Sequence, residues 1–144
     1  MLTQLLLGGL VSFVNFGIHA VMTGLIVVIT RRIAGTTDDL HVLMRVSALM
    51  LVTVVALTAT HVSEIAVWAA FITVAGITAT NLTAFEFAFE NYTALGYGDV
   101  VAGQGWRLIG AIMALNGLLL IGWSVAIIFE VMRMAELQFG RRDR

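Results

Sequence analysis

The feature that most constrains this chain is a set of long stretches without an Asp, Glu, Lys or Arg side chain. They include residues 1–30, 46–63 and 108–129. Each one reaches the roughly 18 to 20 residues that a helix needs to cross the hydrocarbon core of a bilayer. The chain is 60% hydrophobic and only 12% charged, whereas soluble domains contain about 25% charged residues. This composition excludes a water-soluble globule and predicts an all-α integral membrane protein.

Three spans are expected, at about 5–30, from about 40 onward, and at about 106–134. The second apolar region is longer than one span, so it is either a single helix or a hairpin that turns near 60–63. No Gly, Pro, Asn or Asp occurs within 59–64 to make a tight turn. A single span also places seven of the eight arginines on one side, which the positive-inside rule assigns to the cytoplasm. We therefore expect three spans with the N-terminus outside, with four spans as the alternative.

The segment between the last two spans, residues 81–105, is too apolar for an ordinary outside loop, yet it contains Glu86, Glu90 and Asp99. Backbone at membrane depth is tolerated as helix, or where it is buried in protein or lines a water-filled path. Thr83 and Glu86 fit a capping box, which predicts a short helix over about 84–93. The negative end of its dipole favours a cation. A re-entrant segment is therefore expected here.

The sequence Thr-Ala-Leu-Gly-Tyr-Gly-Asp follows directly at 93–99. Its two glycines, Gly96 and Gly98, stand at alternate positions and permit positive φ, so that successive carbonyls can point the same way. Four such strands around one axis would make stacked rings of oxygen atoms.

At these residues the chain resembles the tetrameric potassium channels, whose filters are rings of backbone carbonyls. The resemblance covers about 41–130 and includes the family's order of outer helix, pore helix, filter and inner helix. Leu95, Gly96, Tyr97 and Gly98 correspond to the family's Val-Gly-Tyr-Gly. Ala94 differs, because the family usually has Thr there and uses its hydroxyl at the innermost ion site.

The resemblance implies a homotetramer that conducts K⁺ passively through one central pore. Its ion-binding filter would comprise Thr93 to Gly98, with K⁺ held at Ala94, Leu95, Gly96 and Tyr97 and no other cofactor. Residues 1–39 would form an additional N-terminal span and cytoplasmic loop, 40–134 the pore domain, and 135–144 a short cytoplasmic tail. The expected partners are K⁺, the lipid bilayer and further copies of the chain, and the expected location is the inner membrane of the cell.

Two other functions stay open. Because Ala94 supplies no hydroxyl, the pore could be a weakly selective monovalent cation channel. The chain could also be a non-conducting subunit that regulates another channel. An enzyme is not expected, because the sequence shows no grouping of His, Ser and carboxylate outside the pore segment. No arginine ladder is present in any span, so a voltage sensor is excluded.

Further site residues follow from the resemblance. Glu90 lies where some bacterial members have a Glu that shares a proton with the Asp after the filter, here Asp99. Gly117 and Gly122 keep the family's inner-helix spacing and are candidate gating hinges, with close helix packing as the alternative. Asn116 would face the cavity or make an interhelical hydrogen bond.

Polar and aromatic residues elsewhere in the spans have simpler interpretations. His61 and Glu64 share one helical face, as a metal or pH-sensing pair or as a polar pair packed at a subunit contact. Ser12, Asn15 and His19 share one face of the first span and are expected to pack on protein. Three tryptophans are expected to be structural, two as anchors at the outer membrane boundary and one in packing: Trp68, Trp106 and Trp123.

Overall fold

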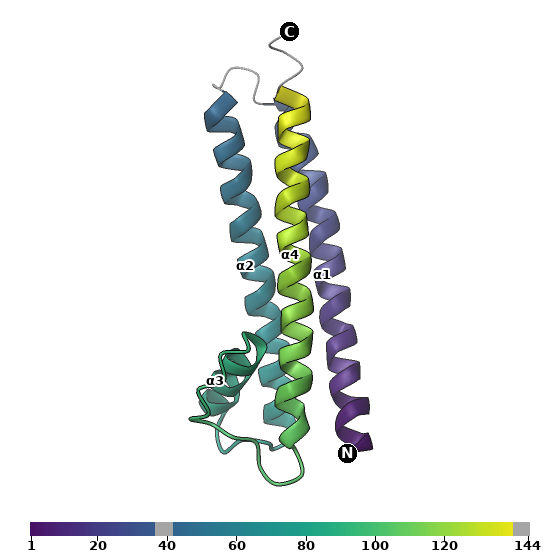
Figure 1. The fold of residues 1–144 in the computed structure, drawn as a ribbon, viewed down its shortest axis with the longest axis vertical. Helices are drawn as coiled ribbons and strands as arrows, with labels where there is room; N and C mark the ends of the chain where they lie inside the picture. The colour runs from purple at the N-terminus through teal and green to yellow at the C-terminus, as the bar shows by residue number, and fades with distance from the viewer. Residues whose placement is uncertain (37–41, 140–144) are drawn as a thin grey trace.

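The computed structural model describes residues 1–36 and 42–139, and helices are the regular secondary structure within them. Its four helices are α1 (Leu2–Thr36), α2 (Val42–Val74), α3 (Asn81–Tyr92) and α4 (Arg107–Phe139). The three long helices run side by side, and the short α3 lies against α2 at the end of the bundle where α1 begins (Figure 1). The segments that flank α3 both lie at that same end (Figure 1). Helix α1 therefore starts at one end of the bundle and α4 finishes at the other.

The three long helices are the candidate membrane spans. The spans cover Leu2–Arg32, Leu43–Val74 and Arg107–Ala135. Only about a quarter of the residues in each apolar window are buried within the chain, so most apolar side chains face outward, as lipid contact requires. The chain is a multi-pass membrane protein.

Helix α2 continues without interruption through residues 59–64, so the alternative of a hairpin with four spans is wrong. A chain without a turn-forming residue there has no reason to leave the helix. The described residues include only part of the expected cytoplasmic loop and tail. Residues 37–41 and 140–144, with three of the arginines, lie outside them.

Helix α3 begins earlier than the sequence pattern suggests. Its N-cap is Thr80, whose hydroxyl accepts a hydrogen bond from the Thr83 N–H at 3.2 Å. The Thr83 hydroxyl in turn accepts from the Thr80 N–H at 3.0 Å. The predicted box between Thr83 and Glu86 is therefore wrong, because Thr83 occupies the third helical position and supplies the oxygen that a Glu supplies in the usual box.

The main apolar core joins α2, α3 and α4 and includes Trp68, Ile72, Phe87, Tyr92 and Met113. At its centre, Gly117 of α4 meets the carbonyl of Tyr92, the last residue of α3. A Cβ at Gly117 would overlap that carbonyl oxygen. The two helices therefore approach at backbone distance, which only glycine permits.

The N-terminal turn of α1 is fixed to the start of α4 by Gln4. Its amide oxygen accepts a hydrogen bond from the Leu108 N–H at 2.9 Å, and its amide nitrogen donates to the Gly105 carbonyl. The Leu108 N–H is one of the amides that an α-helix leaves without an internal partner. Helix α1 is thus an integral part of the bundle and packs against both α2 and α4.

Candidate functional site

Residues 93–98, which the resemblance assigns to the filter and which we call the filter segment, leave α3 through a Schellman turn. Thr93 is the C-cap, and Ala94 follows it with φ 56°. The Leu95 N–H bonds to the Glu90 carbonyl at 2.9 Å and the Ala94 N–H to the Asn91 carbonyl at 3.0 Å. These two bonds define the motif and satisfy carbonyls that the end of a helix otherwise leaves free. The start of the filter segment is therefore fixed by the backbone of α3 itself.

Positive φ recurs at every second residue of this segment. The values are 56° at Ala94, 62° at Gly96 and 79° at Gly98. Both glycines thus have the backbone conformation expected from the sequence, and Ala94 adds a third position. In an ordinary strand, successive carbonyls alternate in direction. Left-handed residues at alternate positions remove that alternation, as a carbonyl-lined ion path requires.

The side chains of the segment have few partners within the chain. Leu95 and Tyr97 are 53% and 71% exposed. The Thr93 hydroxyl donates to the Phe89 carbonyl at 2.8 Å, so it is engaged by its own helix. Asp99 is exposed and Glu90 half-buried. Among the described residues, no hydrogen bond joins these two carboxyl groups, so a single chain does not bring the expected pair together.

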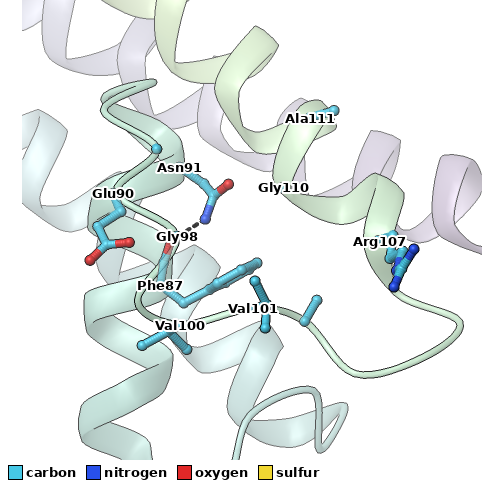
Figure 2. Close-up of a pocket in the computed structure, with 11 residues that line it drawn as sticks. Phe87, Glu90, Asn91, Gly98, Val100, Val101, Arg107, Gly110 and Ala111 are labelled. Atoms are coloured by element: carbon cyan, nitrogen blue, oxygen red, sulfur yellow. Dashed lines mark hydrogen bonds between the residues drawn. The ribbon is translucent and has the colours of Figure 1, made fainter.

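A pocket of about 490 Å³ lies between the filter segment, α3 and the start of α4 (Figure 2). Glu90 and Asn91 line its α3 side, and Arg107 and Gly110 line its α4 side. A Cβ at Gly110 would lie 2.5 Å from the Asn91 side-chain oxygen, so this glycine leaves room for the amide. Glu90 therefore lines the same pocket as Gly96 and Gly98 of the filter segment.

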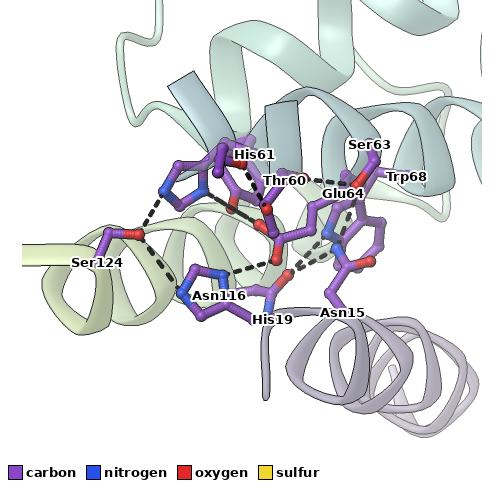
Figure 3. Close-up of polar contacts among 11 residues, drawn as sticks. Asn15, His19, Thr60, His61, Ser63, Glu64, Trp68, Asn116 and Ser124 are labelled. Atoms are coloured by element: carbon purple, nitrogen blue, oxygen red, sulfur yellow. Dashed lines mark hydrogen bonds and ion pairs between the residues drawn. The ribbon is translucent and has the colours of Figure 1, made fainter. Parts of the chain in front are cut away.

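A second group of polar side chains is buried in the middle of the bundle (Figure 3). We call it the buried polar cluster; its members are His19, His61, Glu64, Tyr92 and Ser124. The His19 Nδ1 lies 2.9 Å from Glu64 Oε1, and the His61 Nδ1 lies 3.1 Å from Glu64 Oε2. The Tyr92 hydroxyl donates to the same carboxylate and lies 2.7 Å from the His61 Nδ1. His19 and Glu64 are completely buried.

The opposite edges of both imidazoles meet at Ser124. Its Oγ lies 2.8 Å from the His61 Nε2 and 3.4 Å from the His19 Nε2. The cluster therefore joins α1, α2 and α4 to the last residue of α3.

An amide layer lies beside the cluster. The Asn15 amide donates to the Glu64 carbonyl and to Asn116 Oδ1, both at 3.2 Å, and the Trp68 indole donates to the same Asn116 oxygen at 3.0 Å. The structure thus places Asn116 in an interhelical hydrogen-bond network. Of the two interpretations offered by the sequence, this placement matches the interhelical one.

A family model described as an ion channel matches residues 49–134, which is more than half of the chain. The match runs from α2 through α3 and the filter segment into α4. The chain belongs to this ion channel family. Membership supports ion conduction, and the family is one of channels rather than of enzymes. Neither a comparison with curated proteins nor one with solved structures finds a match.

The sequence of this ion channel predicted some residues of the buried polar cluster as neighbours, but not the complete cluster. The face of α1 with Asn15 and His19 and the pair of His61 and Glu64 were both visible as helical spacings. Tyr92 and Ser124 carried no such signal. The expectation that His, Ser and carboxylate do not group outside the pore segment is wrong, because packing of three helices brings them together.

The tryptophans differ in their roles. Trp68 is fully buried, so its expected position as an interfacial anchor is wrong; its indole N–H has a partner inside the bundle, which makes burial favourable. Trp106 is half-buried at the start of α4, with its ring 6.1 Å from that of Phe71. Trp123 packs beside His19 with ring centroids 5.3 Å apart, as expected of a packing residue.

Proposed function

We propose that this ion channel is a homotetramer that conducts K⁺ passively through a filter formed by the backbone of Thr93 to Gly98. The observation that supports this most directly is the positive φ at Ala94, Gly96 and Gly98, immediately after the C-terminus of α3. Backbone carbonyls arranged in rings can replace the hydration shell of a cation. K⁺ would occupy the rings at Ala94, Leu95, Gly96 and Tyr97.

The geometry of one chain supports assembly of several copies, and four is the number that the resemblance to tetrameric potassium channels implies. A single filter segment cannot surround an ion, and closed rotational symmetry is the usual solution for identical chains. The exposed side chains of Leu95 and Tyr97 are then covered by neighbouring copies. In this assembly α3 is the re-entrant pore helix, since the chain reaches it and leaves it at the same end of the bundle (Figure 1).

A weakly selective cation channel is the second candidate, and Ala94 favours it. This residue has no hydroxyl, and the Thr93 hydroxyl is bonded to the Phe89 carbonyl. The cavity end of the filter therefore has only carbonyl oxygens, so the innermost site should hold K⁺ weakly.

Reconstitution into liposomes tests both candidates. With K⁺ on one side and an equal concentration of Na⁺ on the other, the reversal potential of the purified wild-type channel should lie far from zero, with the K⁺ side negative. Gly98→Ala should abolish the current, because a Cβ is strained at φ 79°. The matched control is Gly24→Ala in α1, where a Cβ meets nothing within 4 Å, and its current should be unchanged.

The other outcomes contradict the proposal in distinct ways. A reversal potential near zero would identify a weakly selective pore. A correctly assembled tetramer without current would identify a non-conducting subunit.

Filter support is proposed to come from Glu90 and Asp99 sharing a proton in the assembled channel. Two carboxyl groups that the assembly brings close together favour one proton between them. Glu90→Gln keeps a neutral hydrogen-bonding partner, whereas Glu90→Ala leaves Asp99 without one. Inactivation measured in the liposome system should therefore change more in the alanine variant. Equal behaviour of both variants would contradict the pairing.

A further inference from the structure

Burying the ionisable side chains of the buried polar cluster inside a membrane protein costs free energy. His19 and Glu64 are 0% exposed in the interior of two membrane spans, and the side chain of His61 is only 19% exposed. Ionisable side chains at such depth are rare, are normally paired, and mark functional sites. The family match explains ion conduction by the pore and assigns nothing to this cluster.

The cluster has fewer protons than close contacts. The six contacts are Glu64 with each imidazole Nδ1, Glu64 with the Tyr92 hydroxyl, the Tyr92 hydroxyl with the His61 Nδ1, and Ser124 with each imidazole Nε2. Two neutral imidazoles, one phenol and one hydroxyl supply one proton each. With an ionised carboxylate, four protons therefore serve six contacts, so two of the contacts have no proton of their own. A cation within the cluster removes this deficit.

One tautomer pattern turns the deficit into a metal site. If both Nε2–H groups donate to Ser124 Oγ, which can accept two hydrogen bonds, both Nδ1 lone pairs point toward the Glu64 carboxylate. A histidine that binds metal through one nitrogen and donates from the other to a neighbouring oxygen is the usual arrangement. Ser124 is then the group that orients both ligands.

The spacing of the ligand atoms suits a small ion. One ligand atom from each of His19, His61 and Glu64 lies within 4.8 Å of the others, and the two Nδ1-to-carboxylate distances are 2.9 and 3.1 Å. Ligands on a tetrahedral ion with bonds of about 2.0 Å lie about 3.3 Å apart. Small shifts of the side chains would therefore centre an ion among them.

We propose that the buried polar cluster binds one divalent metal ion of the zinc class. The ligands are the Nδ1 atoms of His19 and His61 and the carboxylate of Glu64, and the Tyr92 oxygen is placed to complete four. Two imidazoles with one carboxylate suit zinc or a similar transition metal, whereas Mg²⁺ and Ca²⁺ favour all-oxygen sites. The ion would connect α1 and α2 to the residue directly before the filter segment, and so brace the pore helix.

Metal content of the purified full-length protein tests the proposal without any current measurement. Protein prepared without chelator should contain about one zinc per chain, as expected of a closed structural site. After chelator treatment, Co²⁺ should produce the intense visible absorption of a four-coordinate ion with nitrogen and oxygen ligands. Wild-type protein that holds no zinc and gives no such Co²⁺ spectrum would overturn the proposal, and would leave an added proton as the cation of the cluster.

Variants locate the site. Glu64→Gln and His61→Gln should each lower zinc affinity by more than 100-fold, and Ser124→Ala by roughly 10- to 100-fold through loss of ligand orientation. The matched control is Glu130→Gln, which removes an α4 carboxylate paired with the exposed Arg133 and should keep full zinc. Zinc retained in a folded Glu64→Gln protein would overturn the site. If that variant does not fold, the wild-type zinc and Co²⁺ measurements decide.

Discussion

Ala94 has two roles, because it belongs to the turn that ends α3 and also to the proposed ion-binding segment. Its φ of 56° costs an L-residue about 1–2 kcal/mol relative to a right-handed conformation. The same residue ends α3 in the turn formed by the Leu95 N–H and the Glu90 carbonyl, a position where glycine is most common. An alanine here keeps the turn but contributes only a carbonyl oxygen to an ion.

Adding oxygen at position 94 should therefore strengthen the innermost ion site. Ala94→Thr and Ala94→Ser each place four hydroxyls at the cavity end of the proposed tetramer, and serine does so without a β-branch at positive φ. We expect both to increase block by Ba²⁺ applied from inside, while K⁺ current persists. Ala94→Gly, which adds no oxygen, should leave Ba²⁺ block unchanged. If neither hydroxyl variant binds Ba²⁺ more tightly, residue 94 does not form the innermost site.

Gly117 and Gly122 both match the inner-helix glycine spacing of the potassium channels, but their surroundings in the fold differ. A Cβ at Gly117 would overlap the Tyr92 carbonyl, whereas one at Gly122 meets nothing within 4 Å. Gly117→Ala should destabilise the folded channel by about 1–3 kcal/mol through overpacking, seen as a lower midpoint in thermal unfolding. Gly122→Ala should leave that midpoint within the error of wild type. Equal stability of the two variants would show that the contact between α3 and α4 is not close.

Gating at Gly122 stays a proposal, since α4 runs without a break through both glycines. Of the two, Gly122 is the one that packing leaves available as a bending point. The space beside Gly117 is occupied by Tyr92 at the end of α3.

At the scale of elements, the sequence predicted the long helices well because uncharged length alone determines them. It also predicted that a short helix precedes the filter, but not its first residue. Thr80 and Thr83 form the cap with two hydroxyls, and the spacing of Thr83 and Glu86 resembles the same motif one turn later. Single-sequence patterns could not decide between these two starts, since both satisfy the rule for a hydrogen-bonding side chain three residues after the cap.

The cap at Thr80 should stabilise α3 measurably. Thr80→Ala removes the acceptor for the Thr83 N–H, which typically costs about 1 kcal/mol. We expect a lower thermal midpoint for the detergent-purified protein. Glu86→Gln is the matched control, because Glu86 is exposed and takes no part in the cap. A larger loss in Glu86→Gln than in Thr80→Ala would restore the cap first expected from the sequence.

At the scale of the whole molecule, α1 is an integral part of the helix bundle of the chain. It supplies Gln4 to the start of α4 and His19 to the buried polar cluster. Helical spacing on α1 showed a polar face, but no pattern in one sequence links residue 19 to residues 64 and 124. Contacts between distant segments depend on how the helices pack, so the complete cluster became visible only in the fold.

The arrangement of the three spans also determines the topology that we predict. Helix α2 is one continuous crossing, so the N-terminus and the end of α4 lie on opposite sides of the membrane. Arginines cluster near the C-terminal end of α1, at the start of α2 and around the end of α4, and this enrichment assigns the side of the membrane that holds these ends to the cytoplasm. The chain has no cysteine, so single variants can be labelled without background. Thr3→Cys should react with a membrane-impermeant maleimide in intact cells, and Thr36→Cys should react only after the membrane is permeabilised. Labelling of Thr36→Cys in intact cells would contradict the orientation, and labelling of both positions from outside would contradict α1 as a membrane crossing.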